Sequence, residues 1–185
     1  MSGIEFPRAD TDLFLLLNGL HADWLDPAMR TFSSITFWIP MYLIVAAAII
    51  KKRRAESIAV LGALLLAFAM CDFLSVHLFK NVFERLRPCH NEEIQASVRL
   101  LENCGGRYGF VSNHAANAFC FATFTFPIFR NKYYTAAILL WAACVAYSRI
   151  YVGKHFPLDV VCGAMFGVLC RQTAMIALRK LRIKN

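Results

Sequence analysis

Apolar residues in this chain gather into five long segments separated by shorter polar stretches. The segments run from about Ser33 to Ile50, Ile58 to Phe79, Ala115 to Phe129, Tyr134 to Tyr151 and Pro157 to Leu178. A helix needs about 20 apolar residues to cross the hydrocarbon core of a bilayer. The composition agrees, because 58% of the residues are hydrophobic, 17% are charged and the mean hydropathy is +0.49. We therefore expect an all-α integral membrane bundle of about five transmembrane helices.

A shorter apolar piece, Leu13 to Leu20, stands near the N-terminus between aspartates. As a helix it spans about 12 Å, against roughly 30 Å of hydrocarbon, so it does not cross. It is either an interfacial or re-entrant helix or a helix packed on the bundle. We see no internal repeat and no linker, and we expect a single domain over residues 1–185.

The basic residues follow the ends of the apolar segments. One cluster is Lys51–Arg54, and a second is Arg130 with Lys132. The last cluster comprises Arg179, Lys180, Arg182 and Lys184. If five crossings alternate, all three clusters fall on one side, which the positive-inside rule assigns to the cytoplasm. Topology accounts for the net charge of +8, so we do not expect nucleic-acid binding.

Polar residues that topology does not need gather on the other side. Lys80 closes the second segment, and Arg87-Pro88 follows. If the helix continues, Lys80 and Arg87 share one face about 10 Å apart, where two cations attract an anion. The alternative is a snorkelling lysine beside an interfacial arginine.

Ser112, Asn113 and His114 stand where the outer loop enters the third segment. Serine and asparagine are good N-caps, and a helix N-terminus offers free N–H groups to a phosphate. The alternative is an ordinary cap without a ligand.

Ser148-Arg149 and His155-x3-Asp159 flank the short turn between the last two segments. An aspartate one helical turn after His155 fixes the imidazole tautomer and leaves the other ring nitrogen free to attack. Charged residues at membrane depth are costly unless they pair or line a polar cavity. The alternative is therefore a simple Arg149–Asp159 pair that stabilises the turn.

Taken together, these three groups resemble the three-part signature of the type 2 phosphatidic acid phosphatase (PAP2) superfamily. That family includes bacterial lipid phosphatases and, more distantly, vanadium haloperoxidases. The matching residues lie between Lys80 and Asp159. The middle motif departs from the usual Pro-Ser-Gly-His, since Asn113 replaces the glycine. Asparagine tolerates unusual backbone angles better than most residues, so the phosphate-binding turn is expected to form.

The resemblance implies a role for each residue of the signature. His155 attacks phosphorus and forms a phosphohistidine, while Asp159 orients it. His114 protonates the leaving oxygen and later activates water. The residues expected to bind the phosphate are Lys80, Arg87, Ser112, Asn113 and Arg149, with Arg85 as an auxiliary contact.

Two of the seven cysteines, Cys89 and Cys104, lie in the outer loop, and the others lie in apolar segments. On an oxidising side of the membrane these two form a disulfide worth roughly 3 kcal/mol by chain entropy. The histidines and cysteines show no spacing typical of a zinc or iron site. We expect no metal and no cofactor.

The predicted function is phosphate or pyrophosphate hydrolysis on a membrane lipid, in a bacterial inner membrane with the active site facing the periplasm. Undecaprenyl diphosphate is our first choice of substrate. Phosphatidylglycerol phosphate, phosphatidic acid and lipid A are the alternatives. A lipid phosphotransferase and a non-catalytic membrane channel or scaffold also stay open, whereas a vanadium peroxidase is expected to be soluble. The sequence predicts no oligomeric state.

Overall fold

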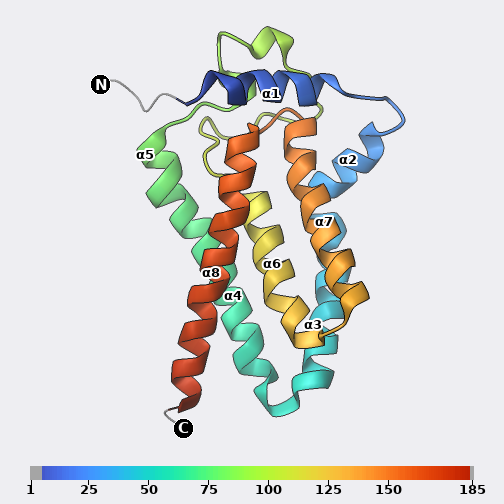
Figure 1. The fold of residues 1–185 in the computed structure, drawn as a ribbon, viewed down its shortest axis with the longest axis vertical. Coiled ribbons are helices and arrows are strands. Elements are labelled where there is room, and N and C mark those ends of the chain that lie inside the picture. Colours follow the sequence, from blue (N-terminus) through green and yellow to red (C-terminus); the bar gives the residue numbers. More distant parts are fainter. Residues whose placement is uncertain (1–5, 184–185) are drawn as a thin grey trace.

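The computed structural model describes residues 6–183, with side chains up to residue 180, and it consists of helices joined by loops (Figure 1). Among these residues there is no strand, only an isolated antiparallel bridge between Leu86 and Tyr108. The prediction of an all-α chain is confirmed. The helices are α1 (Arg8–Gly19), α2 (Asp26–Ser33), η1 (Thr36–Trp38), α3 (Ile39–Arg53), η2 (Arg54–Glu56), α4 (Ser57–Leu74), η3 (Ser75–Lys80), α5 (Asn81–Phe83), η4 (Pro88–His90), η5 (Gln95–Ser97), α6 (Asn113–Phe129), α7 (Lys132–Tyr151) and α8 (Pro157–Ile183).

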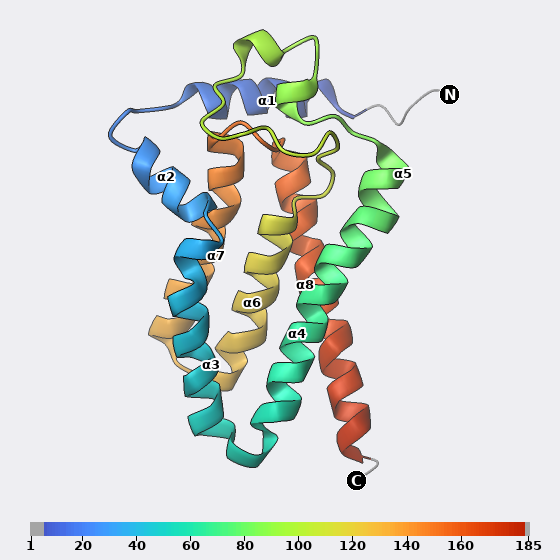
Figure 2. The ribbon, with the colours of Figure 1, turned by 180° about the vertical axis from the view of Figure 1, so that it is seen from behind.

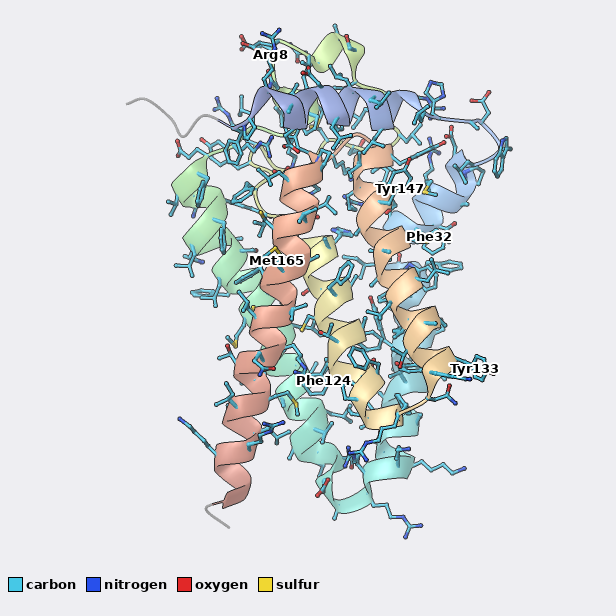
Figure 3. All side chains as sticks on the ribbon, viewed as in Figure 1. Arg8, Phe32, Phe124, Tyr133, Tyr147 and Met165 are labelled. Atoms are coloured by element: carbon cyan, nitrogen blue, oxygen red, sulfur yellow. A yellow bond between two sulfur atoms is a disulfide. The ribbon has the colours of Figure 1, made fainter. Side chains whose placement is uncertain are left out.

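The long helices α3, α4, α6, α7 and α8 occupy the five apolar segments. By length and composition, two helical stretches, Thr36–Phe83 and Pro157–Lys180, are apolar enough to cross a membrane. Large apolar side chains project from the outer faces of the bundle (Figure 3), as expected for helices that face lipid. Examples that are more than half exposed are Leu43, Ile44, Ile58, Leu65, Leu140, Met165 and Leu169.

Helix α6 runs through the middle of the bundle, and Figure 2 shows it between α3 and α4. Its closest partner is α8, where two glycines face the α6 backbone. A Cβ atom on Gly163 would lie 2.5 Å from the carbonyl oxygen of Ser112, and one on Gly167 would lie 2.0 Å from that of Ala116. Only glycine permits this approach of the two backbones. The contact fixes the first turns of α6 against the start of α8.

Helix α1 lies across one end of the bundle (Figure 1), so it does not run alongside the long helices. Phe14 is fully buried against Phe156, with 5.3 Å between ring centroids. The side chain of Asn18 donates to the carbonyl oxygens of Ile150 and Tyr151, at 3.2 and 2.9 Å. The short apolar piece is therefore a helix that packs on the bundle, at the end where an interfacial helix is also expected to lie.

Helix α2 was not predicted, because its eight residues carry too few apolar positions to stand out from the flanking loop. It begins at Asp26, whose carboxylate accepts from the hydroxyl of Tyr151 at 2.8 Å and from Arg99. These contacts attach α2 to α7 and to the outer loop.

The basic clusters lie together at the end of the bundle opposite α1. The turn that follows α3, the turn between α6 and α7 and the C-terminal part of α8 all point to that end (Figure 1). Lys184 lies outside the described residues. The arrangement matches the sidedness expected from the sequence, with the polar loop 84–112 at the other end.

Candidate active site

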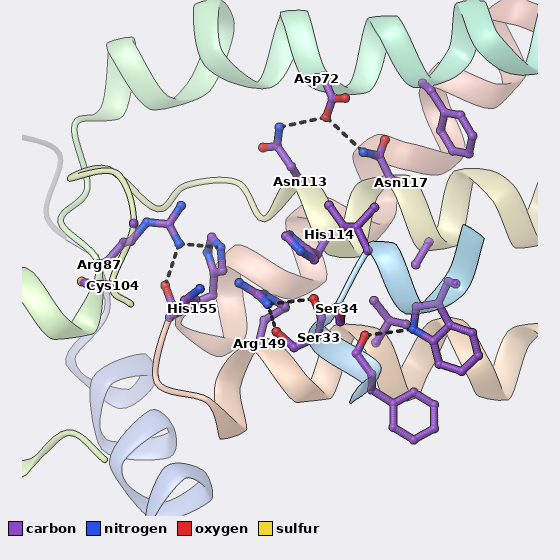
Figure 4. Close-up of a pocket in the computed structure, with 18 of the residues that line it drawn as sticks. Ser33, Ser34, Asp72, Arg87, Cys104, Asn113, His114, Asn117, Arg149 and His155 are labelled. Atoms are coloured by element: carbon purple, nitrogen blue, oxygen red, sulfur yellow. Dashed lines mark hydrogen bonds between the residues drawn. The ribbon is translucent and has the colours of Figure 1, made fainter. Parts of the chain in front are cut away.

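A cavity of about 570 Å³ opens at the α1 end of the bundle, beneath the outer loop (Figure 4). Such a volume takes a whole ligand headgroup rather than a phosphate alone. Part of the wall is apolar and includes Trp38, Tyr42 and Phe68. The polar side chains that line it include Ser33, Ser34, Asp72, Lys80, Arg87, Asn113, His114, Asn117, Arg149, Lys154 and His155.

His155 is placed by the tight turn between α7 and α8. Gly153 adopts φ +82°, where a side chain would be strained, and the N–H of His155 bonds to the carbonyl of Arg149 at 3.2 Å. The imidazole is 2% exposed. Its Nε2 lies 3.1 Å from Nη1 of Arg87, and its Nδ1 lies 3.4 Å from Oδ2 of Asp159. One ring nitrogen thus faces the cations, and the other faces a carboxylate.

The charge state of His155 follows from these surroundings. Burial lowers its pKa well below 6.5, and the nearby cations Arg87, Arg149 and Lys80 lower it further. At neutral pH the ring is therefore uncharged and keeps a lone pair for a nucleophilic role.

Asp159 is fully buried behind His155, in the first turn of α8. Its Oδ2 accepts the N–H of Phe156 at 3.0 Å, and its Oδ1 accepts Nη1 of Arg85 at 2.6 Å. The chain at Gly109 closes over this pair, since a Cβ there would lie 3.1 Å from Asp159 Oδ2. The sequence-based alternative, a pair between Arg149 and Asp159, is not what the structure shows.

Arg85 does not line the cavity, although we expected it to contact the phosphate. Its guanidinium carbon lies 4.0 Å from the ring centroids of both Phe6 and Phe156. Its second nitrogen, Nη2, donates to Oδ2 of Asp10 at 2.5 Å. With carboxylates on both sides and rings on both faces, Arg85 supports Asp159 from behind.

The predicted cations Lys80, Arg87 and Arg149 come together on the cavity wall, but not as one helical face. The helix that carries Lys80 ends at Phe83, because Glu84 is left-handed at φ +47°. Arg87 is extended, as its position before Pro88 requires. Burial lowers the pKa of Arg87, against the opposing effect of Asp159. The loop, rather than a continuous helix, brings the two cations together.

Arg149 is nearly fully buried, and its Nη1 donates to the hydroxyl of Ser33. The carboxylate of Glu102 lies 3.7 Å from Arg149 and 2.8 Å from Nζ of Lys154. Burial alone would raise the pKa of Glu102, but hydrogen bonds from Lys154 and Ser33 lower it. Sequence reasoning missed Lys154 and Glu102. A lysine beside His155, on the side where topology requires none, was the available signal.

The N-terminal turn of α6 supplies the middle motif. Ser112 is fully buried and its hydroxyl caps the helix by accepting the N–H of Ala115 at 3.5 Å, so it lies behind the cavity wall. His114 lines the cavity (Figure 4). Asn113 is the first helical residue, so it does not use unusual backbone angles as we expected. Instead its side chain turns towards Asp72 on α4.

A disulfide joins Cys89 and Cys104 with 6.1 Å between their Cα atoms, as we expected for this loop. Cys104 and Gly105 line the cavity, so the cross-link holds part of its wall. His90 lies within 4.8 Å of both sulfurs, but the bond occupies the two thiols. The other cysteines are free.

The fold and the cavity together define a class of protein: an apolar helical bundle with a histidine, its carboxylate and a set of cations suited to phosphate at one end. Comparison with known families agrees. The model of the PAP2 superfamily matches residues 58–183, and the chain belongs to this superfamily.

Individual proteins with known descriptions are also similar to this chain. The lipid A 4′-phosphatase of Porphyromonas gingivalis is 38% identical, over 88% of this chain and 70% of that protein. The lipid A 4′-phosphatase of Bacteroides thetaiotaomicron is 34% identical, over 89% of this chain and 75% of that protein. An undecaprenyl-diphosphatase of Sulfolobus acidocaldarius is 31% identical over 70% of this chain and 58% of that protein.

Among solved structures, Aquifex aeolicus LpxE superimposes with a TM-score of 0.73 at 28% identity. The match covers 94% of this chain and 98% of that one. The bundle described above is therefore the fold of a membrane lipid phosphatase of the PAP2 type.

Proposed function

We propose that this protein hydrolyses a phosphate ester of lipid A through a phosphohistidine intermediate. The observation that carries the chemistry is the position of His155, between the carboxylate of Asp159 and the cations of the cavity. A buried neutral imidazole with one nitrogen against a carboxylate and the other towards an anion site is arranged for attack on phosphorus.

In the first step, Nε2 of His155 forms a bond to phosphorus as the bond to the leaving lipid oxygen breaks. Lys80, Arg87 and Arg149 neutralise the charge on the phosphoryl oxygens. His114, protonated when the anionic substrate is bound, gives that proton to the leaving oxygen. Asp159 stabilises the positive charge that develops on the imidazole.

In the second step, His114 takes a proton from water, whose oxygen attacks phosphorus and releases inorganic phosphate. The bond to Nε2 breaks, and His155 returns to its neutral form. Because positively charged side chains already surround the phosphoryl group, we propose that no metal takes part. The same intermediate would serve a phosphotransferase, in which a lipid hydroxyl replaces water.

Two similar proteins with known descriptions support lipid A as the substrate, and this changes our first choice. Undecaprenyl diphosphate was preferred from sequence alone, but the relative described as an undecaprenyl-diphosphatase matches less of the chain. Lipid A, named among the alternatives, is favoured instead. The apolar wall of the cavity, with Trp38 and Phe68, suits the acylated part of such a lipid.

We propose the location and orientation of the protein from the distribution of its basic residues. The basic clusters lie at the end of the bundle opposite the cavity, which the positive-inside rule assigns to the cytoplasm. A multi-pass arrangement in the inner membrane then opens the active site to the periplasm, where an oxidised Cys89–Cys104 pair persists.

The test is phosphate release by the purified protein in detergent from lipid A, phosphatidylglycerol phosphate, phosphatidic acid and undecaprenyl diphosphate. We expect the highest kcat/KM on lipid A and no measurable release after His155→Ala. Alkaline denaturation during turnover of ³²P-labelled lipid A should trap label on the protein, and His155→Ala should abolish that label. An unchanged rate in folded His155→Ala protein would show that His155 has no catalytic role, and would refute the proposal.

A further inference from the structure

One wall of the cavity carries a polar group that the phosphate chemistry does not use. Oδ1 of Asp72, on α4, accepts the side-chain amides of Asn113 and Asn117 at 3.1 and 3.0 Å. The hydroxyl of Ser75 donates to Oδ1 of Asn113 at 2.9 Å. Figure 4 shows His114 between this group and Arg149. We name Asp72, Asn113 and Asn117 the acceptor wall.

A carboxylate in the last turn of an apolar helix requires an explanation. Asp72 is flanked by Cys71 and Phe73, and such a position disfavours charge unless it serves a function. Asp72 forms no ion pair within the described range 6–183, and its side chain accepts from the neutral amides of two asparagines. The two asparagines stand four residues apart on one face of α6, next to His114. Their spacing matches a shared acceptor rather than a cap.

The acceptor wall has hydrogen-bonding capacity to spare. Both asparagine amides bond to the same oxygen of Asp72, so within the described chain Oδ2 carries no hydrogen bond. Oδ1 of Asn117 is buried and likewise has no partner there. Both residues line the cavity. Asp72 is exposed on the cavity wall, whereas the oxygen of Asn117 is buried, and a ligand with donors would satisfy both acceptors.

We infer that the acceptor wall selects substrates whose headgroup places hydroxyl or amide N–H donors beside the phosphate, as an N-acylated amino sugar does. The inference rests on the proposed function and names the residues that choose the substrate. A diphosphate lipid offers no such donors, and its second phosphate would meet the charge of Asp72. The acceptor wall therefore both attracts the sugar and repels the diphosphate.

The inference also explains why the middle motif departs from its family pattern. A glycine at position 113 would leave Asp72 with one amide partner, and the hydroxyl of Ser75 with the carbonyl oxygen of Asp72 as its acceptor in place of the Asn113 side chain. Asn113 joins α4 to α6 and orients the carboxylate, while His114 keeps its place in the cavity. The substitution thus belongs to specificity rather than to the backbone of a phosphate turn.

Asp72→Asn is the sharpest test, because an asparagine oxygen can still accept both amides while the spare acceptor becomes a donor. With purified protein in detergent, kcat/KM for lipid A should fall about tenfold or more relative to kcat/KM for phosphatidic acid, whose glycerol hydroxyls are esterified. The rate on undecaprenyl diphosphate should rise relative to lipid A. Asn117→Ala should reduce the same lipid A preference without a change of charge.

The control is Asp23→Asn, which removes an outer aspartate outside the cavity, 98% exposed and 3.4 Å from Arg99. It should keep all rates within about twofold. Equal losses on every lipid in both folded variants, or no change in the lipid A preference, would overturn the inference alone. Wild-type protein that hydrolyses phosphatidic acid but not lipid A would overturn the proposed function, and the inference with it.

Discussion

Arg85 and Asp159, 74 residues apart in the chain, form a buried ion pair in which Nη1 and Oδ1 are 2.6 Å apart. Both side chains are almost fully shielded, and Asp10 of α1 binds the other guanidinium nitrogen. His155, the proposed nucleophile, is therefore supported by a chain of contacts: His155 lies against Asp159, Asp159 against Arg85, and Arg85 against α1.

Replacement of Arg85 by alanine should lower kcat far more than it raises KM. Without the guanidinium, Asp159 is a buried carboxylate held only by the N–H of Phe156 and orients His155 less well. Complete loss of an orienting carboxylate costs about 10⁴ in kcat, which sets the upper limit of the effect. Steady-state phosphate release measures both constants. The double variant Arg85→Ala/Asp159→Asn should be little worse than Asp159→Asn alone, since residues acting through one another are not additive.

Arg107→Ala is the matched control, because Arg107 is exposed and its guanidinium only approaches the ring of Tyr108, at 5.9 Å. It should keep wild-type kinetics. A rise in KM with constant kcat in Arg85→Ala would instead support the auxiliary phosphate contact that the sequence suggested.

The fold was predictable because apolar length is a local property. A run of apolar residues long enough to cross lipid forms a helix whatever it packs against, so the five long helices follow from composition. Helix α2 could not be predicted in this way, because the contacts that hold it in place come from Tyr151 and Arg99, which are far from it in the sequence.

The features of the site also divide into those that the sequence predicts and those that depend on the packing of distant segments. Lys80, His114 and His155 were found because their spacing forms a motif. The support of Asp159 by Arg85, and the link between Asp72 and Asn113, depend on which helices are neighbours. Residue spacing in one sequence carries no such information.

In the pH profile of kcat/KM, the fall in activity on the acid side should lie below pH 6.5; we call this fall the acid limb. Burial and neighbouring cations lower the pKa of His155, so the nucleophile stays unprotonated until the solution is more acidic than its ordinary pKa. Lys80→Gln removes one of these cations. Protonation of the ring then becomes easier, and the limb should move to higher pH.

A pH–rate profile of the residual activity tests this shift. Lys52→Gln, at the far end of the bundle, removes the same charge and should leave the limb in place. A limb that stays at the same pH in Lys80→Gln would show that this lysine does not act on His155.

Thiol counts should distinguish the paired cysteines from the free ones. Denatured, non-reduced protein should present five thiols, the number left free by the Cys89–Cys104 bond, and reduction should raise the count to seven. Cys104→Ser should lower the free energy of unfolding by about 3 kcal/mol through loop entropy. Cys144→Ser is the control, and seven thiols without reductant would refute the bond.

The glycine contact between α6 and α8 predicts that alanine has different effects at Gly167 and at Gly62. Gly167→Ala places a methyl group 2.0 Å from the carbonyl oxygen of Ala116, so the helices must separate, whereas Gly62→Ala on α4 meets nothing within 4 Å. Overpacking costs about 1–3 kcal/mol, so only Gly167→Ala should lower the Tm in detergent. Because Ala116 lies two residues after His114, the same variant should also reduce kcat. Equal Tm values for the two variants would show that the bundle relaxes around the added methyl, and that the position of His114 does not depend on Gly167.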